Sequence, residues 1–458
     1  MNNSWDMIVD FTILSFLLFI GSILKARISV LRKLILPTSM VAGFLGLLLG
    51  PEVLGWLPID MDILGDFVYH LMGIGFIALS LKERDVKKSP DLVNSGMLIV
   101  STYLIQGIVG FGLLLILVKA AYPNMFPGIG LLLPLGYGQG PGQAYSIGNQ
   151  WEQLGVKGGG NLGLTVAGFG FIWATFVGVI FINYLVRSKR FKKEHLKTQK
   201  EHSNIVEESA PDEIPLSDAI DRLTYQGAVI GFIYLITYFT LFGLERLLMP
   251  LGTYGETLAK LLIGFHFLIG SLYAMLFRYV LNRLERAGLK LEHSTNNYLL
   301  QRISGFSFDY MIAASISAIS IYALREYLIP ILLLTTIGGI ITIIFLLWLV
   351  PKVFSRHQLA NVLGFYGMLT GTISTGMALV KAVDPKFQSD TPDNLVMGSA
   401  TAIVFGFVLL LILNVPVVGY LQNRPEMYIY TFLALILYFA ALMGILLYRT
   451  NKQSSAKE

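Results

Sequence analysis

The sequence predicts an all-α polytopic membrane protein, and three observations support this fold class. Of the 458 residues, 54% are hydrophobic and only 14% are charged, whereas soluble domains contain about 25% charged residues. Charge-free apolar runs recur at the length of a membrane helix, which is roughly 20 residues for a hydrocarbon core of about 30 Å. Two further apolar segments are interrupted by Gly, Pro, Ser and Thr. The chain is therefore expected to cross the membrane many times and to hold two irregular segments within it.

Eleven apolar stretches qualify as membrane spans. The first starts near Met7, has no basic residue before it and runs into Lys25-Ala26-Arg27. It lacks a small-residue cleavage site, so we expect a retained span and no cleavable signal peptide. The predicted spans are 7–24, 34–50, 63–81, 96–118, 158–186, 223–244, 258–280, 303–324, 327–350, 395–417 and 427–448.

Basic residues set the predicted topology, because Lys and Arg collect in cytoplasmic loops. They cluster at 25–33, 82–88, 187–222, 278–302, 352–386 and 449–457. Placing these clusters inside puts the N-terminus outside and the C-terminus in the cytoplasm. It also requires the two interrupted segments to enter and leave the membrane on one face each. We therefore predict a re-entrant hairpin at about 128–151 from outside and another at about 358–382 from inside.

An internal repeat relates the two halves of the chain. "YGQGPGQA" (137–144) aligns with "YGMLTGTI" (366–373), and two weaker matches occur in the same order, "GIGFIALSL" with "AASISAISI" and "NLGLTVAGFGFI" with "NLVMGSATAIVF". We predict two inverted-topology repeats, each of five spans and one hairpin, at 1–186 and 223–417. A cytoplasmic linker, basic and then acidic, joins them at 187–222. An extra C-terminal span and cytoplasmic tail follow at 418–458.

Several classes of protein are disfavoured by what the sequence lacks. There is no cysteine, hence no thiolate nucleophile or thiolate metal site. Neither an HExxH pattern nor a GxxxxGK[ST] loop occurs, which argues against a zinc hydrolase and an ATP-driven pump. The spans also lack a nucleophile–base pair, so an intramembrane enzyme is not expected. The net charge of +5 follows from the topology and gives no reason to expect nucleic-acid binding.

The chain resembles the bacterial sodium/glutamate symporter family, which is related to citrate- and malate-type carboxylate carriers. The similarity lies in "LRKLILPTSMVAGFLGLLLG" (31–50), "LPLGYGQGPGQAYSIGNQW" (133–151), the span from Asn161 to Leu185, and "LGFYGMLTGTISTGMALVKAVDP" (363–385). The family's first hairpin usually carries a GGxG tract, and Gly136-Tyr137-Gly138-Gln139-Gly140 takes its place here. The resemblance implies two hairpins that meet at a substrate site, an elevator-like transport domain that moves against a scaffold, and a homodimer.

The hairpin tips are the expected substrate-binding positions. Half-helix N-termini attract anionic groups, and unwound carbonyls and hydroxyls offer oxygen ligands to a coupling ion. Tight turns and close helix packing are the alternative explanation for the glycines. The candidates are Tyr137, Gly138, Gln139, Gly140, Gly142 and Gln143 in the first tip, and Tyr366, Gly367, Thr370, Gly371, Thr372, Ser374 and Thr375 in the second.

Four residues are candidate sodium ligands. Asp309 lies within a predicted span, where a carboxylate costs roughly 2.5–3.5 kcal/mol on insertion scales, so a functional role is the default hypothesis. Ser307 is its close neighbour. Asn161 and Asn394 occupy matching positions in the repeat and could ligate an ion through their amide oxygens. The alternatives are that Asp309 caps the start of a helix at the membrane surface and that the asparagines are structural caps.

The expected function is secondary active transport in the bacterial plasma (inner) membrane. We expect sodium-coupled symport of glutamate, or of a related small anionic amino acid or dicarboxylate, by alternating access, with membrane lipid as the surroundings and no further cofactor. An ion channel and a proton-coupled carrier of another organic solute are the alternatives. Broken segments from opposite faces of one chain favour a carrier, because inverted repeats with discontinuous helices are typical of secondary transporters.

Overall fold

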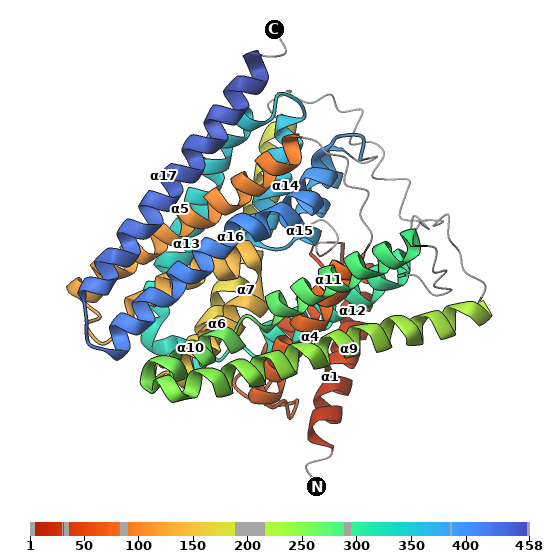
Figure 1. Ribbon diagram of the computed structural model, residues 1–458, viewed down its shortest axis with the longest axis horizontal. Helices are drawn as coiled ribbons and strands as arrows, with labels where there is room; N and C mark the ends of the chain where they lie inside the picture. The colour runs from red at the N-terminus through yellow and green to blue at the C-terminus, as the bar shows by residue number, and fades with distance from the viewer. Residues whose placement is uncertain are drawn as a thin grey trace. The chain divides into compact units, whose positions relative to one another are not determined.

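The computed structural model describes residues 5–29, 31, 36–82, 90–187, 216–287, 295–384 and 387–455, and among these residues it contains helices and connecting loops but no strand. Most of the predicted linker 187–222 lies outside the described residues. The chain divides into two compact units. The first comprises Met1–Ile20, Ala42–Asp85 and His202–Ala318, and the second comprises Gly21–Val41, Val86–Glu201 and Ile319–Glu458 (Figure 1).

The first unit is built from seven α-helices and a short 3-10 turn among the described residues. It holds most of α1 and α3, and all of α4 and α9 to α12. Two of its helices begin with side-chain caps, since the Asp60 carboxylate accepts from the backbone N–H of Asp62 at 2.8 Å and Asn296 accepts from that of Leu299 at 3.0 Å. The bounds are α1 Asp6–Arg27, α3 Thr38–Leu49, α4 Met61–Leu81, α9 Leu216–Leu248, η4 Met249–Leu251, α10 Thr253–Ile263, α11 His266–Arg286 and α12 Asn297–Ser317.

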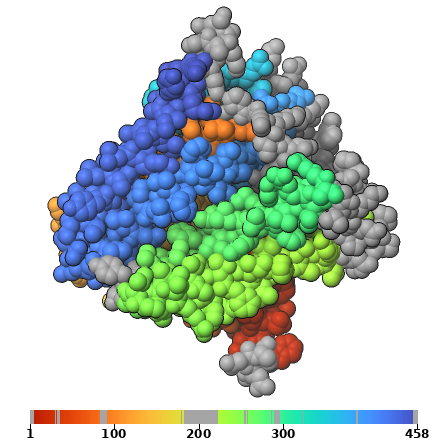
Figure 2. All heavy atoms as spheres, viewed as in Figure 1, coloured from red at the N-terminus to blue at the C-terminus, as the bar shows by residue number. Residues whose placement is uncertain are grey.

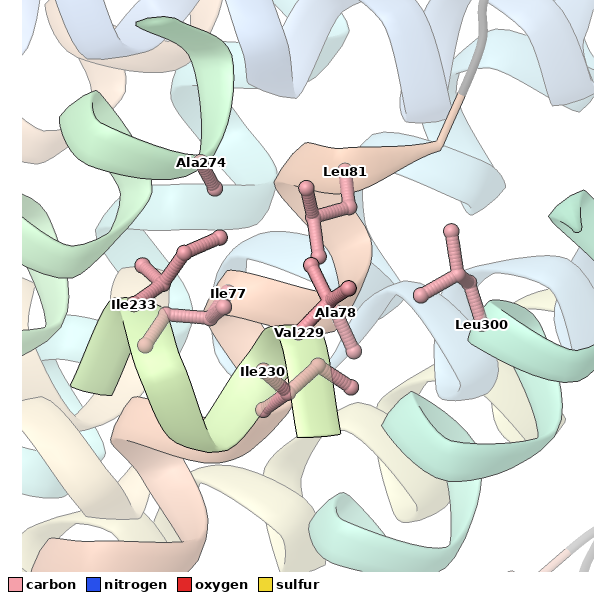
Figure 3. Packing of buried hydrophobic residues seen from close by; sticks show 8 residues of the cluster. All are labelled: Ile77, Ala78, Leu81, Val229, Ile230, Ile233, Ala274 and Leu300. Carbon is pink, nitrogen blue, oxygen red and sulfur yellow. The ribbon is translucent and has the colours of Figure 1, made fainter. Parts of the chain in front are cut away.

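The core of this first unit lies where α4, α9, α11 and α12 pack together. Figure 3 shows side chains from all four helices converging. The fully buried Ile77, Ile233, Ala274 and Leu300 come from the four helices in turn. Between membrane helices van der Waals packing replaces the hydrophobic driving force, so the close packing of this cluster holds the four helices together.

The second unit contains both of the predicted hairpin segments. Its helices are α5 Pro90–Ala120, η1 Pro127–Leu131, η2 Pro134–Gln139, α6 Pro141–Gln153, α7 Gly159–Arg187, α13 Ile321–Val353, α14 Gln358–Thr370, α15 Ile373–Val383, α16 Thr391–Leu421 and α17 Glu426–Ser455. The predicted hairpin 128–151 is a broken helix, η1–η2–α6. The predicted hairpin 358–382 is a pair of helices, α14 and α15, joined at Gly371 and Thr372.

The extra C-terminal span is confirmed as a helix, α17. It packs on α5, α13 and α16, and α16 and α17 lie side by side on the visible surface in Figure 2. The Tyr438 hydroxyl donates to the Phe405 carbonyl at 2.6 Å, and the Phe111 and Phe432 rings are in contact. α17 is therefore an integral part of the second unit.

The helix count differs from the eleven predicted spans. Eight helices among the described residues are long and apolar enough to cross a membrane. The predicted span 34–50 is a helix of only 12 residues, α3. The predicted span 258–280 is divided between α10 and α11, because the helix stops at Gly264 and restarts at His266. The predicted span 303–324 ends too late, since α12 stops at Ser317.

The two compact units do not coincide with the two predicted repeats. Each unit takes helices from both halves of the chain. A repeat is defined by similarity of sequence and a compact unit by contacts within the fold, so the boundaries of the two need not agree. The repeat boundaries and the faces on which the hairpins enter the membrane stay predictions.

Candidate functional site

A glycine interrupts the first broken helix, η1–η2–α6. Gly140 has φ +100° and ψ 174°, a conformation that only glycine adopts without strain. Before it, η2 is wound as a π-helix, a form that occurs frequently at functional sites. After it, α6 begins at Pro141, so the backbone N–H groups of Gly142 and Gln143 lie at the positive end of a helix.

The second break has a hydroxyl cap. Thr372 precedes α15, and its side chain accepts from the Thr375 backbone N–H at 3.3 Å. The Thr370 hydroxyl donates to the Tyr366 carbonyl at 2.6 Å. Gly371 separates the two helices, so the C-terminal end of α14 and the N-terminal end of α15 meet at one point. Ser374, also predicted for this tip, is exposed.

Helix α5 contacts both tips through two side chains, the partly buried Tyr103 and the buried Gln106. The Tyr103 hydroxyl donates to the Gly138 carbonyl at 3.0 Å. The Gln106 amide nitrogen donates to the Leu369 carbonyl and to the Thr342 hydroxyl, each at 2.9 Å. The two tips, which are more than two hundred residues apart in the chain, thus share neighbours on one helix.

The Gln106 side chain leaves one polar atom unused. Gln106 is fully buried, and its carbonyl oxygen Oε1 has no hydrogen-bond partner within the described part of the chain. A Cβ at Gly138 would lie 3.3 Å from this oxygen, so Oε1 faces the first tip. The amide oxygen of Gln143, a predicted site residue, is likewise buried and unpaired. Other buried side-chain atoms among the described residues also lack a partner, but these two are amide oxygens beside the first tip, where a cation or an N–H donor can satisfy them.

Helix α7 brings the tips together from another side. A Cβ on Gly170 would lie 2.4 Å from the Thr370 carbonyl oxygen and 2.8 Å from Cδ1 of Tyr137. Only glycine allows such an approach of backbones. We call Tyr103, Gln106, Gly138, Gly170 and Leu369, with Tyr137 and Thr370, the tip cluster.

The two tyrosines that the predicted repeat aligns both bond to helices of the other half of the chain. The Tyr137 hydroxyl donates to the Thr335 carbonyl on α13 at 2.7 Å. The Tyr366 hydroxyl donates to the Trp173 carbonyl on α7 at 3.4 Å. Both tyrosines are fully buried. Each tyrosine therefore anchors its own tip to a helix from the opposite half.

The four predicted sodium ligands are divided between the two compact units. Asp309 and Ser307 lie on α12 in the first unit, where Asp309 is exposed and the Ser307 hydroxyl donates to the Ile303 carbonyl at 2.9 Å. Asn161 and Asn394 lie in the second unit. No group of three or more His, Asp or Glu that could hold a metal ion occurs within the described ranges.

Both asparagines have structural partners. The Asn161 amide oxygen accepts from the Ser320 backbone N–H at 2.9 Å, just before α13 begins. The Asn394 amide nitrogen donates to the Asn361 amide oxygen at 3.2 Å. Asn361 is in the first turn of α14, about 14 Å from the tip at 1.5 Å per residue. The Asn161 contact agrees with the capping alternative, whereas the Asn394 contact joins side chains of α16 and α14 and is not a helix cap.

Sequence reasoning missed four residues around the tips, namely Tyr103, Gln106, Thr335 and Thr342. A signal existed for one of them. Gln106 is the only amide in the otherwise apolar run 96–118, and a polar residue within a span is a functional candidate by default. The threonines and the tyrosine have no comparable signal, because hydroxyls within helices commonly bond to their own backbone.

The loop after α15 contains a carboxyl group, that of Asp384, whose pKa is shifted. Burial alone would raise the pKa of the Asp384 carboxyl, but bonds from the backbone N–H groups of Gln388 and Ser389, at 3.0 and 2.8 Å, hold this pKa below its ordinary value of 3.8. A depressed pKa means that the ionised form stabilises the fold above the ordinary value. That stabilisation is lost as the pH falls below 3.8 through the lowered pKa.

We expect Asp384→Asn to lower the free energy of unfolding at neutral pH by at most about 1 kcal/mol, because the carboxylate is only partly buried. The difference in melting temperature between the two proteins should shrink as the pH falls below 3.8. A difference that is the same at pH 7 and pH 3 would show that the charge contributes nothing.

Two broken helices surround buried amide and backbone oxygens, and eight helices among the described residues are long and apolar enough to cross a membrane. These features are typical of a multi-pass membrane protein of the secondary-transporter class. The model of the sodium/glutamate symporter family matches residues 4–389, so the chain belongs to that family. Searches of curated proteins and of solved structures gave no match. Family membership implies sodium-coupled transport of glutamate, and it makes the chain a transporter instead of an enzyme. The matched segment ends before α16 and α17.

Proposed function

We propose that this protein is a sodium-driven glutamate carrier that binds ion and substrate at the tip cluster. The observation that carries the proposal is the unpaired amide oxygen of Gln106, buried between two interrupted helices. Sodium prefers hard oxygen ligands, and unwound carbonyls at such breaks coordinate it in secondary transporters. The oxygens of Gln106 and of the Gly138 and Leu369 carbonyls meet that requirement.

The substrate carboxylates are assigned to the helix N-termini. No Lys or Arg is among the residues of the tip cluster. The starts of α6 and α15 offer backbone N–H groups and positive dipole ends, which stabilise anions. The Thr372 and Thr375 hydroxyls add donors at the second tip. Gln143 can accept from the substrate ammonium group through its unpaired oxygen.

Sodium is favoured over a proton as the coupling ion. A proton-coupled site needs a group that gains and loses a proton near neutral pH. The described side chains of the tip cluster are an amide, hydroxyls and tyrosines, none of which titrates there in its unperturbed form. A steady ionic current, as an open channel would give, is the second candidate, and no observation at the tips favours it.

Alternating access by an elevator-like movement is part of the proposal. Both tips belong to the second compact unit, and none of the tip cluster belongs to the first. A division into a substrate-holding body and a separate body is what such a movement needs. The homodimer, the inner-membrane location and the outside N-terminus rest on the family resemblance and on the charge pattern.

Reconstitution into proteoliposomes tests the proposed function. Glutamate should accumulate under an inward sodium gradient, saturably, and should not accumulate under a proton gradient alone. A panel of other amino acids and dicarboxylates sets the specificity. Accumulation driven by protons without sodium, or a conductance that does not saturate with substrate, would refute the proposal.

Asp309 is proposed to contribute negative charge to the ion's path. Asp309→Asn keeps the size of the side chain and is cheaper to place in a membrane, so the variant should fold. We expect it to lose most sodium-driven accumulation, with a several-fold rise in the sodium concentration that gives half-maximal uptake. An unchanged sodium dependence would reduce Asp309 to an interfacial residue and leave the ion site to the tips.

A further inference from the structure

A cavity lies in the second unit, and its walls include no residue of the tip cluster. Its volume is about 590 Å³. Its walls come from both ends of the first broken segment, from the start of α13 and from the connection between α16 and α17. The residues that matter for its chemistry include Phe126, Lys157, Glu326, Tyr327, Tyr420 and Arg424.

The cavity combines charges with aromatic rings. Lys157 and Arg424 are cations and Glu326 is a carboxylate, and all three side chains are exposed, so they can reorient toward a ligand. The Phe126 ring packs against the rings of Tyr420 and Tyr428 on the cavity wall. The two cations can bind an oxyanion of a ligand, and the carboxylate can accept a hydrogen bond from a donor group. The aromatic rings can pack against an apolar part of the ligand.

The part of the cavity wall formed by α16 and α17 lies beyond the segment that matches the family. Gly419, Arg424 and Tyr428 all lie beyond residue 389, where the family match ends. This wall is firmly attached, because the Tyr438 hydroxyl bonds to the Phe405 carbonyl and the Arg449 guanidinium reaches the Asn94 amide oxygen at 3.4 Å. The extra helix thus builds a cavity as well as covering α5.

The surroundings of the cavity are those of a membrane surface. It lies at the N-terminal end of α17, an apolar span whose next residues Ile429, Tyr430 and Leu433 are 61%, 57% and 49% exposed. Such a helix presents these side chains to lipid, and Tyr, Lys and Arg at its end are typical of the headgroup region. The volume is in the range of about 300–1,000 Å³ for sites of drug-sized ligands and exceeds what a free amino acid fills.

We propose that this cavity binds the headgroup of a membrane phospholipid. Arg424 and Lys157 hold the phosphodiester oxyanion, and Glu326 accepts from a hydroxyl or ammonium group of the headgroup. The glycerol and the first carbons of the chains lie against the tyrosine rings. A lipid in this position contacts Pro127 and Lys157, at the two ends of the first broken segment, and so holds that segment at its base. The site is independent of which solute is transported.

Binding of short-chain phospholipids to the purified protein in mild detergent tests the site. Phosphatidylglycerol and phosphatidylethanolamine should raise the melting temperature, and phosphatidylcholine, whose quaternary amine donates no hydrogen bond, should raise it less. Native mass spectrometry gives the fraction of protein that retains each lipid. Removing the two cations in Lys157→Gln with Arg424→Gln should weaken phosphatidylglycerol binding by roughly fivefold for each charge.

Two control variants test whether the loss of lipid binding is specific to the cavity. Lys119→Gln removes an exposed cation in the last turn of α5, next to the cavity residue Val118 but not on the cavity wall, and should leave lipid binding unchanged. Glu326→Gln should weaken phosphatidylethanolamine and spare phosphatidylglycerol, because only the ammonium group needs the charge. Equal lipid binding by the double variant and the wild type would overturn the proposal. Glycerol phosphate or glutamate binding as tightly as the lipid, with the same loss in the double variant, would overturn it in favour of a site for free anions.

Discussion

Gln106→Met is expected to leave the protein folded and to reduce sodium-driven glutamate uptake by about 30- to 100-fold. Methionine matches the length of glutamine and is well tolerated in cores. It removes the unpaired Oε1 that we assign to the ion, and it leaves the Leu369 carbonyl and the Thr342 hydroxyl without their donor. Loss of the oxygen ligand to the ion should cost about 2–3 kcal/mol, which gives the expected reduction because 1.4 kcal/mol corresponds to a factor of ten. The unpaired carbonyl and hydroxyl should lower the melting temperature.

The kinetic pattern separates an ion ligand from a packing residue. If Gln106 binds sodium, the sodium concentration for half-maximal uptake should rise more than the corresponding glutamate concentration. Thr102→Val is the matched control on the same helix, because the buried Thr102 hydroxyl bonds only to its own backbone, at Leu98. It should transport normally. A Gln106→Met protein with wild-type sodium dependence would remove Gln106 from the ion site.

The positions of the tips could be predicted from sequence because their signals are local. Gly140 at φ +100° and the Gly371–Thr372 junction lie in runs of Gly, Pro and Thr that interrupt apolar segments, and Gly and Pro are the poorest helix formers. The contacts that complete the site are not local. Gln106 and Leu369 are 263 residues apart, and no periodicity along the chain indicates that they meet.

The ion-site prediction, which stays a prediction, also rests on single residues. Asp309 is a candidate because of the cost of a carboxylate in a membrane, which is a property of one residue. Its membership of the first unit, apart from the unit that holds the tips, depends on tertiary packing. Span boundaries failed for a related reason. The break between α12 and α13 at Ala318–Ser320 has no Gly or Pro to mark it, and the bond from the Ser320 N–H to Asn161 helps to fix it.

Gly170→Ala is expected to separate the two tips and to reduce uptake by about tenfold or more. Its Cβ would lie 2.4 Å from the Thr370 carbonyl oxygen, which is backbone, and 2.8 Å from the Tyr137 ring, which is buried and anchored to Thr335. Neither neighbour is the free end of a flexible side chain, so α7 or a tip must shift. A shift of about 1 Å at a binding site can cost roughly 100-fold in rate.

Two other helical glycines serve as controls that separate the steric effect at Gly170 from the effect of alanine on helix propensity. Gly→Ala within a helix should by itself stabilise by about 0.5–1 kcal/mol. Gly406, on α16, has open space where a Cβ would be placed, and Gly168, on α7, meets only the end of the Ile319 side chain at 3.1 Å. Gly406→Ala and Gly168→Ala should therefore keep wild-type uptake, with equal or higher melting temperatures. Gly170→Ala should lose uptake and also bind glutamate more weakly in detergent, because the tips supply both ligands. Normal uptake by Gly170→Ala would mean that contact between the tips is not required for transport, and the tip cluster would no longer be the preferred site.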